Sequence, residues 1–494
     1  MESASLFVMQ CLDSSFGVMT FQMDDAPRLD ARGDQQVAEP QARLADDDDD
    51  DGQQGTTTQV DVAVVVIGDF GRSPRMQYHA LSLADQGQRV SVVAVRGTPP
   101  IEPLRAHPNV SLHLMRELQF AAWPRLLRYA LKAVCQTLLL LWSLLFAIRR
   151  PHVVLVQNPP SVPTLPCVWL ACRLRGSKMI VDWHNYGYTI LAMNVRHENL
   201  LVKIYEWVEF FFGARADAGF CVSEAMRADL ASRGIRGAIV LYDKPPTMFQ
   251  PIDWEQQDSL RRVHEVLVRL SRCVDGAAAA AALSPSPTET ALTTCDAQGH
   301  VVRKPSRSRP VVLLSSTSWT EDEDFGLLFA ALKKYDKAAQ PDAADILCIV
   351  TGKGPQKEFY VDKISRLDLK KVKIFTPWLD IADYPTVVAL SNFGVCLHKS
   401  SSSLDLPMKI VDMFGCCVPV LAWNYRCISE LVQPDVTGLL FESSDQLCRH
   451  LLKMCDVSSE PVLAGWRNNL HKWQELRWER NWETVAKHVL VSAK

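Results

Sequence analysis

The chain has 494 residues, 48% of them hydrophobic, and a formal net charge of −3. This length predicts two or three domains with sizeable cores, and the charge balance does not suggest a protein that binds nucleic acid through a strongly basic surface. The 14 cysteines lack the spacing of metal sites and the N-terminus lacks the regions of a secretory signal, so we expect reduced, buried cysteines rather than disulfides.

The first 58 residues are polar and acidic, and we expect them to be disordered. The aspartate run Asp46–Asp51 is interpreted as a solvated tail. From Val60 the sequence VDVAVVVIG is continuously apolar and β-branched, which is typical of a strand buried on both faces of a parallel sheet. A helical pattern follows this strand and ends at Gly87.

Further strand patterns alternate with helical stretches in the first half of the chain: VSVVAV, VSLHLM, HVVLVQN, MIVDWHN and AGFCVS. Alternating strands and helices predict a doubly wound α/β domain, which we place at residues 59–250. In such a domain, ligands bind beyond the carboxyl ends of the strands.

A nearly all-apolar stretch at residues 126–148 interrupts this alternation. Its uninterrupted apolar core, Thr137–Ile148, is shorter than the roughly 20 residues that span a bilayer. Polar residues form a stripe on its first half, so the pattern favours a helix that lies in a membrane interface. A long buried helix is the alternative, and a full span would place two charged residues in the bilayer at a high cost.

Composition divides the rest of the chain into three parts. Residues 253–309 contain an alanine run and Ser/Pro-rich stretches, which indicate a low-complexity linker or surface insertion. The patterns PVVLLSSTSW, DILCIVTG, VKIFTPW, FGVCLHK and VPVLAW then predict a second doubly wound domain at residues 310–450. The Trp-rich tail, residues 451–494, is expected to be helical, and such a tail can pack back across the first domain.

Residues 401–420, SSSLDLPMKIVDMFGCCVPV, combine a serine run with a short amphipathic helical pattern. Lys409 and Asp412 are three residues apart, so on a helix they point the same way. Pro407 favours a helix start, where free backbone N–H groups attract phosphate. The lysine therefore suggests a diphosphate site and the carboxylate a ligand for sugar or ribose hydroxyls. An ordinary capped helix packed against a core is the alternative.

Other chemistry-bearing residues also follow strands. Asp182 and His184 suit acid–base work or binding of sugar hydroxyls, and the alternative is that they satisfy loop backbone groups. The acidic segment at 322–324 resembles the DxD of metal-dependent sugar transferases, but we interpret it as a helix start. The sequence has no GxGxxG, which argues against a dinucleotide-dependent dehydrogenase, and no GxSxG or HExxH.

Several segments carry a resemblance to a known family: GDFGRSPRMQYHA, VQNPPSVPTL, DWHNYGY, SSTSWTEDEDF, TGKGP and SSSLDLPMKIVDMFGCCVPV. They resemble the chitobiosyldiphosphodolichol β-mannosyltransferases, which are GT-B glycosyltransferases. The similarity covers about 60–250 and 310–445 and leaves out the acidic N-terminus and the 253–309 segment. It implies an α/β fold of two doubly wound, Rossmann-like domains that face a cleft.

The resemblance implies a reaction in which GDP-mannose is the donor and GlcNAc₂-diphosphodolichol is the acceptor of a β-1,4-linked mannose. A β product from an α-linked donor implies inversion by direct displacement. That requires a general base for the acceptor hydroxyl and stabilisation of the leaving GDP. Asp69, Asp182 and His184 are the candidate bases, and the sequence does not rank them.

The resemblance also implies where the substrates bind. The second domain is expected to bind GDP-mannose through Gly352, Gly354, Ser401, Ser402, Asp405, Lys409 and Asp412. The first domain is expected to bind the acceptor and its diphosphate near Gly68, Gly71, Arg72 and Arg75. The acidic residue upstream of Asp412 is spaced differently from that of retaining relatives, which fits a different stereochemical course. No cofactor or bound metal is required, although a divalent metal could stimulate the reaction.

The expected partners are GDP-mannose, the dolichol-linked acceptor, the endoplasmic reticulum membrane and other mannosyltransferases that act on lipid-linked oligosaccharides. Because the dolichol tail stays in the bilayer, the catalytic domains are expected on the cytosolic face of that membrane. Two alternatives stay open. One is another GT-B mannosyltransferase with a different lipid-linked acceptor, and the other is an inactive transferase fold that acts as a membrane scaffold.

Overall fold

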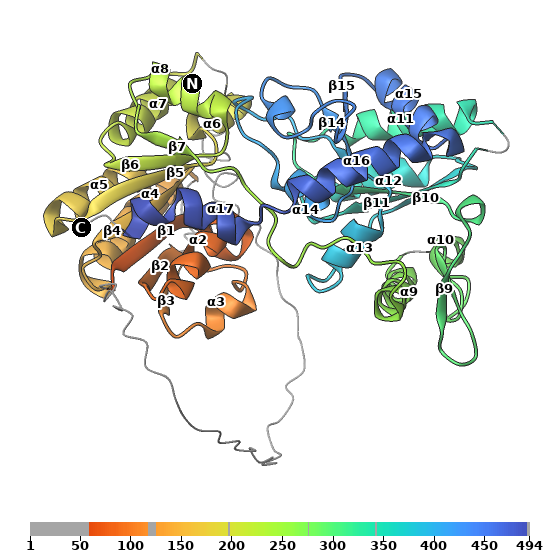
Figure 1. Ribbon diagram of the computed structural model, residues 1–494. Helices are drawn as coiled ribbons and strands as arrows, with labels where there is room; N and C mark the ends of the chain where they lie inside the picture. The colour runs from red at the N-terminus through yellow and green to blue at the C-terminus, as the bar shows by residue number, and fades with distance from the viewer. Residues whose placement is uncertain (1–58, 117–124, 196–197, 275, 341–342, 492–494) are drawn as a thin grey trace, which may run out of the picture.

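The computed structural model describes residues 59–116, 125–195, 198–274, 276–340 and 343–491. The expectations of disorder at 1–58 and of a solvated run at Asp46–Asp51 lie outside the described residues. Figure 1 shows two α/β units side by side, each built on its own parallel sheet. The predicted two-domain α/β architecture is therefore confirmed.

The first domain is built on a seven-stranded sheet with the order β3-β2-β1-β4-β5-β6-β7. Every neighbouring pair of strands is parallel. The strands are β1 (Asp61–Asp69), β2 (Arg89–Val95), β3 (Val110–Met115), β4 (Val153–Asn158), β5 (Lys178–Trp183), β6 (Ala218–Cys221) and β7 (Ala238–Val240).

The central strand β1 is buried on both faces, as its continuous apolar run predicts. Val62 and Val64 pack in one hydrophobic cluster with residues of α2, whereas Ala63 and Val65 pack in another with residues of α4, α5 and α8. The helical elements of this domain are η1 (Phe70–Arg72), α2 (Pro74–Asp85), α3 (Glu102–Ala106), α4 (Arg125–Trp142), η2 (Ser143–Ala147), α5 (Thr164–Arg175), α6 (Gly187–Val195), α7 (Leu200–Gly213) and α8 (Glu224–Ser232).

The second domain repeats the design on a six-stranded parallel sheet with the order β12-β11-β10-β13-β14-β15. Its strands are β10 (Val311–Ser316), β11 (Ile346–Thr351), β12 (Val372–Phe375), β13 (Phe393–Cys396), β14 (Val420–Trp423) and β15 (Gly438–Phe441). Its helical elements are α11 (Phe325–Ala338), α12 (Lys357–Ser365), α13 (Tyr384–Leu390), α14 (Met408–Gly415), η4 (Ile428–Glu430) and α15 (Ser444–Met454). The sequence-based strands all form, and the edge strands β7 and β15 are additional.

The segment 253–309 is a folded surface insertion rather than a linker. It forms α9 (Gln257–Arg272), α10 (Ala277–Leu283), the antiparallel pair β8 (Thr293–Cys295) and β9 (Val301–Arg303), and η3 (Ser306–Ser308). Val263, Val266 and Leu267 of α9 are buried in the hydrophobic cluster of the second domain. The alanine run becomes α10, so its low complexity reflects a helix and not a lack of structure.

The apolar segment 126–148 forms α4 and one π-helical turn, η2. Leu140 and Leu144 are buried in the core of the first domain. The opposite side carries exposed apolar residues at four-residue spacing, namely Val134, Leu138, Trp142 and Phe146. Among the described residues, the structure contains no helix that is both long and apolar enough to cross a membrane.

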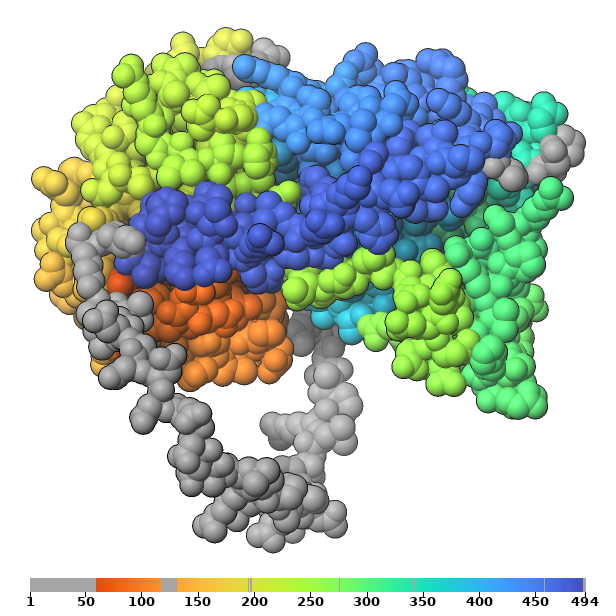
Figure 2. All heavy atoms as spheres, viewed as in Figure 1, coloured from red at the N-terminus to blue at the C-terminus, as the bar shows by residue number. Residues whose placement is uncertain are grey.

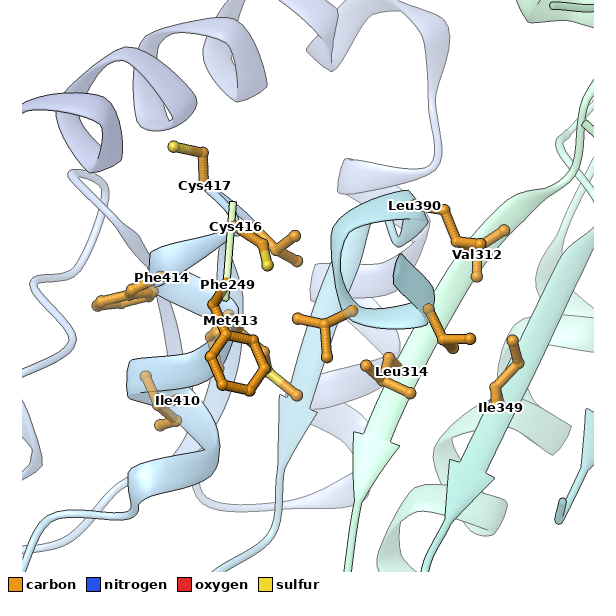
Figure 3. Close-up of a cluster of buried hydrophobic side chains, with 14 of the residues drawn as sticks. Phe249, Val312, Leu314, Ile349, Leu390, Ile410, Met413, Phe414, Cys416 and Cys417 are labelled. Carbon is orange, nitrogen blue, oxygen red and sulfur yellow. The ribbon is translucent and has the colours of Figure 1, made fainter. Parts of the chain in front are cut away.

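Helix α14 packs its apolar face against the second sheet (Figure 3). Ile410, Met413 and Phe414 of this helix are buried in one cluster with Phe249. Lys409 and Asp412 lie at the intervening positions of the same helix. The following pair of cysteines is buried, and every cysteine that the structure describes is a free thiol.

The C-terminal helices return from the second domain to the first. After η5 (Val457–Ser459) and α16 (Glu460–Trp473), the helices α17 (Trp478–Val485) and α18 (Lys487–Val491) lie along the first domain, where Figure 2 shows the blue tail against red, orange and green segments. Trp478 Nε1 donates to Ser82 Oγ at 3.1 Å, and Trp482 Nε1 donates to His79 Nδ1 at 3.0 Å. Both indoles are buried with residues of β1 and α2.

Candidate active site

The loops at the carboxyl ends of the two sheets touch across the domain boundary. Ser401, after β13, has its Oγ 2.9 Å from Thr189 Oγ1 and accepts a hydrogen bond from Asn185 Nδ2 at 3.3 Å. Both partners follow β5 of the first sheet. Glu430 of the second domain accepts backbone N–H groups from Glu224 and the next residue, at the start of α8. The loops after β5 and β13 therefore form opposite sides of one candidate site.

Lys409 is held by a buried carboxylate. Its ammonium pairs with Glu323, which also accepts a hydrogen bond from Thr317 Oγ1 at 2.5 Å. Burial opposes a charge on Lys409, but the nearby Glu323 carboxylate outweighs burial and raises the pKa of the lysine. The Lys409 side chain is still 19% exposed, so its cation can also meet an anion from the site.

The glycine loop after β11 packs directly on the loop after β10. A Cβ atom on Gly352 would lie 1.7 Å from the carbonyl oxygen of Thr317, and one on Gly354 would lie 1.6 Å from that of Ser318. Gly352 also has a φ of 152°, which L side chains rarely adopt. Both glycines are therefore required by the close approach of two backbones at this edge of the sheet.

Asp412 lies beside a partly buried tyrosine. Tyr384 Oη donates to Asp412 Oδ2 at 3.5 Å and is 2.9 Å from Ser316 Oγ. Burial raises the pKa of Asp412 to about 7. A carboxylate of this kind accepts hydrogen bonds from neighbouring hydroxyl groups, which suits the ribose of a nucleotide.

The loop that contains the serine run is held by an imidazole between two carboxylates. His398 Nδ1 is 3.1 Å from Asp322 Oδ2, and its Nε2 is 3.0 Å from Asp405 Oδ2. Burial lowers the pKa of His398, but hydrogen bonds to the two carboxylates outweigh burial and raise it to about 9. Asp405 also accepts from Ser400, whose Oγ is 3.4 Å from that of Ser402. Asp405 and Ser402 thus shape this loop, and their direct contact with the donor stays a prediction.

His184 and Asp182 form a dyad at the end of β5. His184 Nε2 lies 2.9 Å from Asp182 Oδ2, and the histidine side chain is 21% exposed whereas the aspartate is fully buried. Burial raises the pKa of Asp182, but the charge of Arg75 and the neighbouring His184 and His79 outweigh it and hold the pKa well below its usual range. The buried carboxylate therefore stays charged and can orient an imidazole that accepts a proton.

Arg75 is not available to bind the lipid diphosphate, which corrects the expectation from the sequence. Its side chain is 1% exposed. The guanidinium donates to both oxygens of Asp182 at 2.8 Å, and also to Asp243 Oδ1 and to the carbonyl oxygen of Leu241 at 2.8 Å each. Its role in this structure is to hold the dyad carboxylate in place.

The remaining predicted residues of the first domain lie at the end of β1 and in the loop after it, and they differ in how far neighbouring groups occupy them. Asp69 accepts backbone N–H groups from Gly71 at 3.1 Å and Thr98 at 2.9 Å, and the Thr98 hydroxyl at 2.7 Å, so its carboxylate is already engaged. Arg72 Nε lies 3.5 Å from Asp69 Oδ2, but 63% of its side chain is exposed, so the guanidinium can also meet an anion. A Cβ atom on Gly71 would lie 2.3 Å from the Thr98 carbonyl oxygen, whereas Gly68 has open space.

A buried carboxylate that the sequence analysis missed supports the loop after β5. Glu209 of α7 accepts hydrogen bonds from Asn158 Nδ2 at 2.7 Å and from the backbone N–H of Gly187 at 2.8 Å. Burial raises the pKa of Glu209 above its ordinary value. Its signal in the sequence is an acidic residue within the apolar stretch of α7, LLVKIYEWVEFFFG.

Two further features bear on ligands. A cavity of about 180 Å³ lies beside the segment that joins the domains and is lined in part by Asp243, Lys244 and Val411.

Among the described residues, no group of three His, Cys, Asp or Glu side chains is arranged to hold a metal ion. Asp324 of the acidic segment accepts the backbone N–H of Gly326 at 3.0 Å and caps α11, so the helix-start interpretation is confirmed for this residue.

Comparison with known proteins places the two domains in one family. Two family models match the chain, "Glycosyl transferase 4-like domain" at residues 70–242 and "Glycosyl transferases group 1" at residues 309–456. The chitobiosyldiphosphodolichol beta-mannosyltransferase of Homo sapiens is 40% identical over 437 residues, which cover 87% of this chain and 92% of the human protein. The chain belongs to the chitobiosyldiphosphodolichol beta-mannosyltransferase family. It is accordingly a glycosyltransferase.

Other relatives and structures agree with this family and its fold. The Dictyostelium discoideum protein of the same name is 34% identical and covers 87% of this chain and 94% of that protein. The "UDP-glycosyltransferase TURAN" of Arabidopsis thaliana is 41% identical and covers 87% of this chain and 96% of that protein. The structure of Anabaena Alr3699/HepE with UDP has a TM-score of 0.58 at 14% identity over 88% of this chain and 99% of that chain. The fold is therefore GT-B, as the resemblance implied.

Proposed function

We propose that this glycosyltransferase moves mannose from GDP-mannose to the terminal N-acetylglucosamine of GlcNAc₂-diphosphodolichol, forming a β-1,4 bond with inversion. One observation carries the proposal: the loop before α14 meets the loop after β5 across the domain boundary, and each side carries a different set of polar side chains. The second domain supplies Lys409 and Asp412, which suit a nucleoside diphosphate. The first supplies His184 backed by Asp182, which suits a hydroxyl acceptor. The names of the relatives supply mannose and the dolichol-linked chitobiose.

We assign His184 as the general base of the displacement. It would take the proton from the acceptor hydroxyl as that oxygen attacks the anomeric carbon, while the bond from this carbon to GDP breaks on the opposite face. Asp182 would stabilise the resulting imidazolium, and its low pKa makes it a poor base itself. Lys409 would neutralise charge on the leaving diphosphate, which is where a displacement of this kind gains most from a fixed cation.

A second candidate concerns the donor nucleotide. The Arabidopsis relative is named a UDP-glycosyltransferase, and a UDP-sugar would use the same diphosphate and ribose contacts. The names of the mannosyltransferase relatives favour GDP-mannose, which is the usual activated form of mannose. Assay of both nucleotide classes therefore belongs in the same experiment.

An apolar face on the first domain supports the proposal that the protein acts on a lipid-linked acceptor at a membrane surface. We propose that this membrane is the endoplasmic reticulum and that the protein lies on its cytosolic face. The apolar face consists of Val134, Leu138, Trp142 and Phe146 of α4 and η2, Leu174 of α5, and Ile204 and Trp207 of α7. The three helices pack side by side, with Trp169 of α5 against Phe212 of α7. Exposed Arg149, Arg150 and Arg173 lie near it in sequence and suit anionic headgroups.

The decisive experiment measures mannose transfer by the full chain in lipid vesicles that contain GlcNAc₂-diphospho-lipid. We expect turnover of GDP-mannose but not of UDP-sugars, and a product that β-mannosidase, but not α-mannosidase, cleaves. Lys409→Ala should lower kcat/KM for GDP-mannose at least tenfold, whereas the exposed Lys373→Ala of the same domain should leave it unchanged.

Each alternative has its own outcome in that experiment. Transfer only to a lipid acceptor that already carries mannose would assign a later step on the same type of carrier. Turnover of a UDP-sugar in place of GDP-mannose would replace the donor. If Lys409→Ala retains full activity, the diphosphate contact proposed for this lysine is wrong.

A further inference from the structure

Glu323 receives hydrogen-bond donors from two separate elements. Its side chain is 2% exposed and lies just before α11. Thr317 Oγ1 donates to it at 2.5 Å and the Ser318 backbone N–H at 3.2 Å, both from the loop after β10. The third donor is the ammonium of Lys409, on α14. An ionised carboxylate is an acceptor-only group with room for all three donors.

The loop that Glu323 holds, at residues 317 and 318, packs directly against the glycine loop that follows β11. Gly352 and Gly354 pack on the carbonyl oxygens of Thr317 and Ser318, too closely for a Cβ atom. Trp319 Nε1 donates to the Gly352 carbonyl oxygen at 3.2 Å, so the two loops are also joined by a hydrogen bond. A shift of residues 317 and 318 would therefore move the glycine loop with it.

The backbone around Glu323 reaches a third loop. Glu323 forms an isolated antiparallel bridge with His398, and the Lys399 N–H donates to the Asp322 carbonyl oxygen at 2.9 Å. His398 is the imidazole that bonds Asp405 in the loop containing the serine run. Residues 322 and 323 thus join the loops after β10 and β13 to Lys409, and through residues 317 and 318 they support the loop after β11.

We propose that Glu323 is a positioning residue of the donor site, which fixes the Lys409 ammonium and the 317–318 loop against the donor diphosphate without touching the donor. The proposal rests on the proposed function of this site. A lysine ends in a point charge on a flexible four-carbon stem, so its place in a site depends on a partner that holds it. A glutamine at position 323 would keep the size of the side chain but would turn an N–H₂ group toward donors, which breaks at least one of the three contacts.

The test compares Glu323→Gln, Lys409→Met and the double variant with the wild-type chain. Glu321→Gln is the matched control, because Glu321 is exposed two residues away. Affinity for GDP and for GMP is measured by calorimetry, and KM is measured separately for GDP-mannose and for the lipid acceptor. We expect Glu323→Gln to weaken GDP binding at least tenfold and GMP binding less, to raise KM for GDP-mannose, and to leave KM for the acceptor unchanged.

The double variant tests whether Glu323 acts through Lys409. If it does, Glu323→Gln lowers GDP affinity less in the Lys409→Met background than in the wild-type chain, since coupled residues are not additive, and the loss that remains measures the support of the 317–318 loop. If the losses of GDP affinity in the two single variants multiply in full in the double variant, the proposal is overturned. A Glu323→Gln variant that binds GDP as well as wild type would also overturn it. If Glu323→Gln does not fold, Glu323→Asp carries the test, because its shorter carboxylate keeps the charge but cannot span all three donors.

Failure of the proposed function would look different. A wild-type chain that binds GDP but does not transfer mannose would contradict the proposed reaction, while a loss of GDP binding in Glu323→Gln would still support the positioning role. Wild-type transfer of mannose with unchanged GDP affinity in Glu323→Gln would support the reaction and overturn the positioning role.

Discussion

The polar side chains of the candidate site differ mainly in how much of each is exposed and in how many hydrogen bonds it already makes. His184 keeps part of its imidazole exposed, whereas Asp182 two residues earlier is fully enclosed by Arg75 and two histidines. Asp69 is accessible but already accepts hydrogen bonds from its own loop. Of the three carboxylate or imidazole groups that follow strands here, the histidine is thus the one placed to gain a proton.

The first prediction concerns this imidazole. Replacing His184 by Ala should lower kcat about 100-fold or more with little change in KM for the donor, because general bases contribute about 10²- to 10⁴-fold. Steady-state rates on the vesicle-bound acceptor measure this effect, with the exposed His471→Ala as control. A His184→Ala enzyme that keeps more than a third of the wild-type kcat would place the base elsewhere.

The second prediction concerns the partly buried carboxylate of Asp412. Burial raises its pKa to about 7, from 3.8, so the folded protein keeps a proton that the unfolded chain loses. The stability that this group contributes is therefore present below pH 3.8 and is lost as the pH rises through about 7. Asp412→Asn cannot ionise, and its free energy of unfolding should exceed that of wild type by an amount that grows across this range.

Urea unfolding at several pH values between 5 and 8.5 measures that difference, which follows from about 1.4 kcal/mol per pKa unit. The exposed Asp368→Asn of the same domain serves as the control for replacing an aspartate by asparagine. The same variant should bind GDP more weakly than wild type, so stability and function change in opposite directions. A gain that is equal at every pH would contradict the raised pKa.

Residue roles were predictable from the sequence only where partners are close along the chain. Lys409 and Asp412 are three positions apart and share α14, as the local pattern indicates. By contrast, Arg75 bonds Asp182 across 107 positions and Glu323 pairs with Lys409 across 86. No local pattern carries such a pairing, which is why Arg75 was assigned to the acceptor and Glu323 to a helix start alone.

At the scale of elements, continuous apolar runs identified the central strands. A strand that is buried on both faces carries apolar residues at successive positions, so its sequence stands out from the polar loops on either side. The edge strands β7 and β15 have only three and four residues and were not identified. Length alone does not account for this, because β6, β12, β13 and β14 also have four residues and were identified. In the insertion, composition concealed a helix. Apolar positions of α9 repeat at helical spacing, and this signal was present in the sequence: Leu260, Val263, Val266, Leu267 and Leu270.

The third prediction belongs to helix α4. A charge in the apolar face should weaken its contact with a bilayer, so Leu138→Glu should lower the rate on a vesicle-embedded acceptor at least fivefold while leaving the rate on a short-chain, water-soluble acceptor unchanged. Phe359→Glu is the matched control, because Phe359 is an apolar side chain of the second domain with a similar exposed fraction, 54% against 60% for Leu138. Equal losses on both acceptors would indicate damage to the fold instead of the membrane contact.

At the scale of the whole molecule, the two domains are joined by more than the segment that links them. Loops of both sheets bond each other at Ser401 and Glu430, and the C-terminal helices cross from one domain to the other. The sequence allowed this return of the tail but did not specify its contacts. The particular indole partners, Ser82 and His79, lie about 400 positions earlier in the chain.

The fourth prediction tests that tail. Trp482 is 1% exposed in the core of the first domain, and its replacement by Ala should destabilise the protein by about 3–5 kcal/mol. The exposed Trp207→Ala should change stability by no more than about 0.5 kcal/mol. Chemical unfolding followed by circular dichroism measures both, and equal stability of the two variants would mean that the tail is not part of the first domain's core.

The path of this tail also sets the order in which the protein can be completed during synthesis. Every strand of the first sheet has been made by residue 240, but the indoles that close its core are at positions 478 and 482. The first domain therefore emerges from the ribosome with an uncovered apolar surface, and the whole second domain is synthesised before the C-terminal helices can cover it. Chaperones that shield exposed apolar surface are expected to act on the first domain during this interval. A chain that lacks the last 20 residues keeps the sheet but loses the indoles of Trp478 and Trp482 from this cluster.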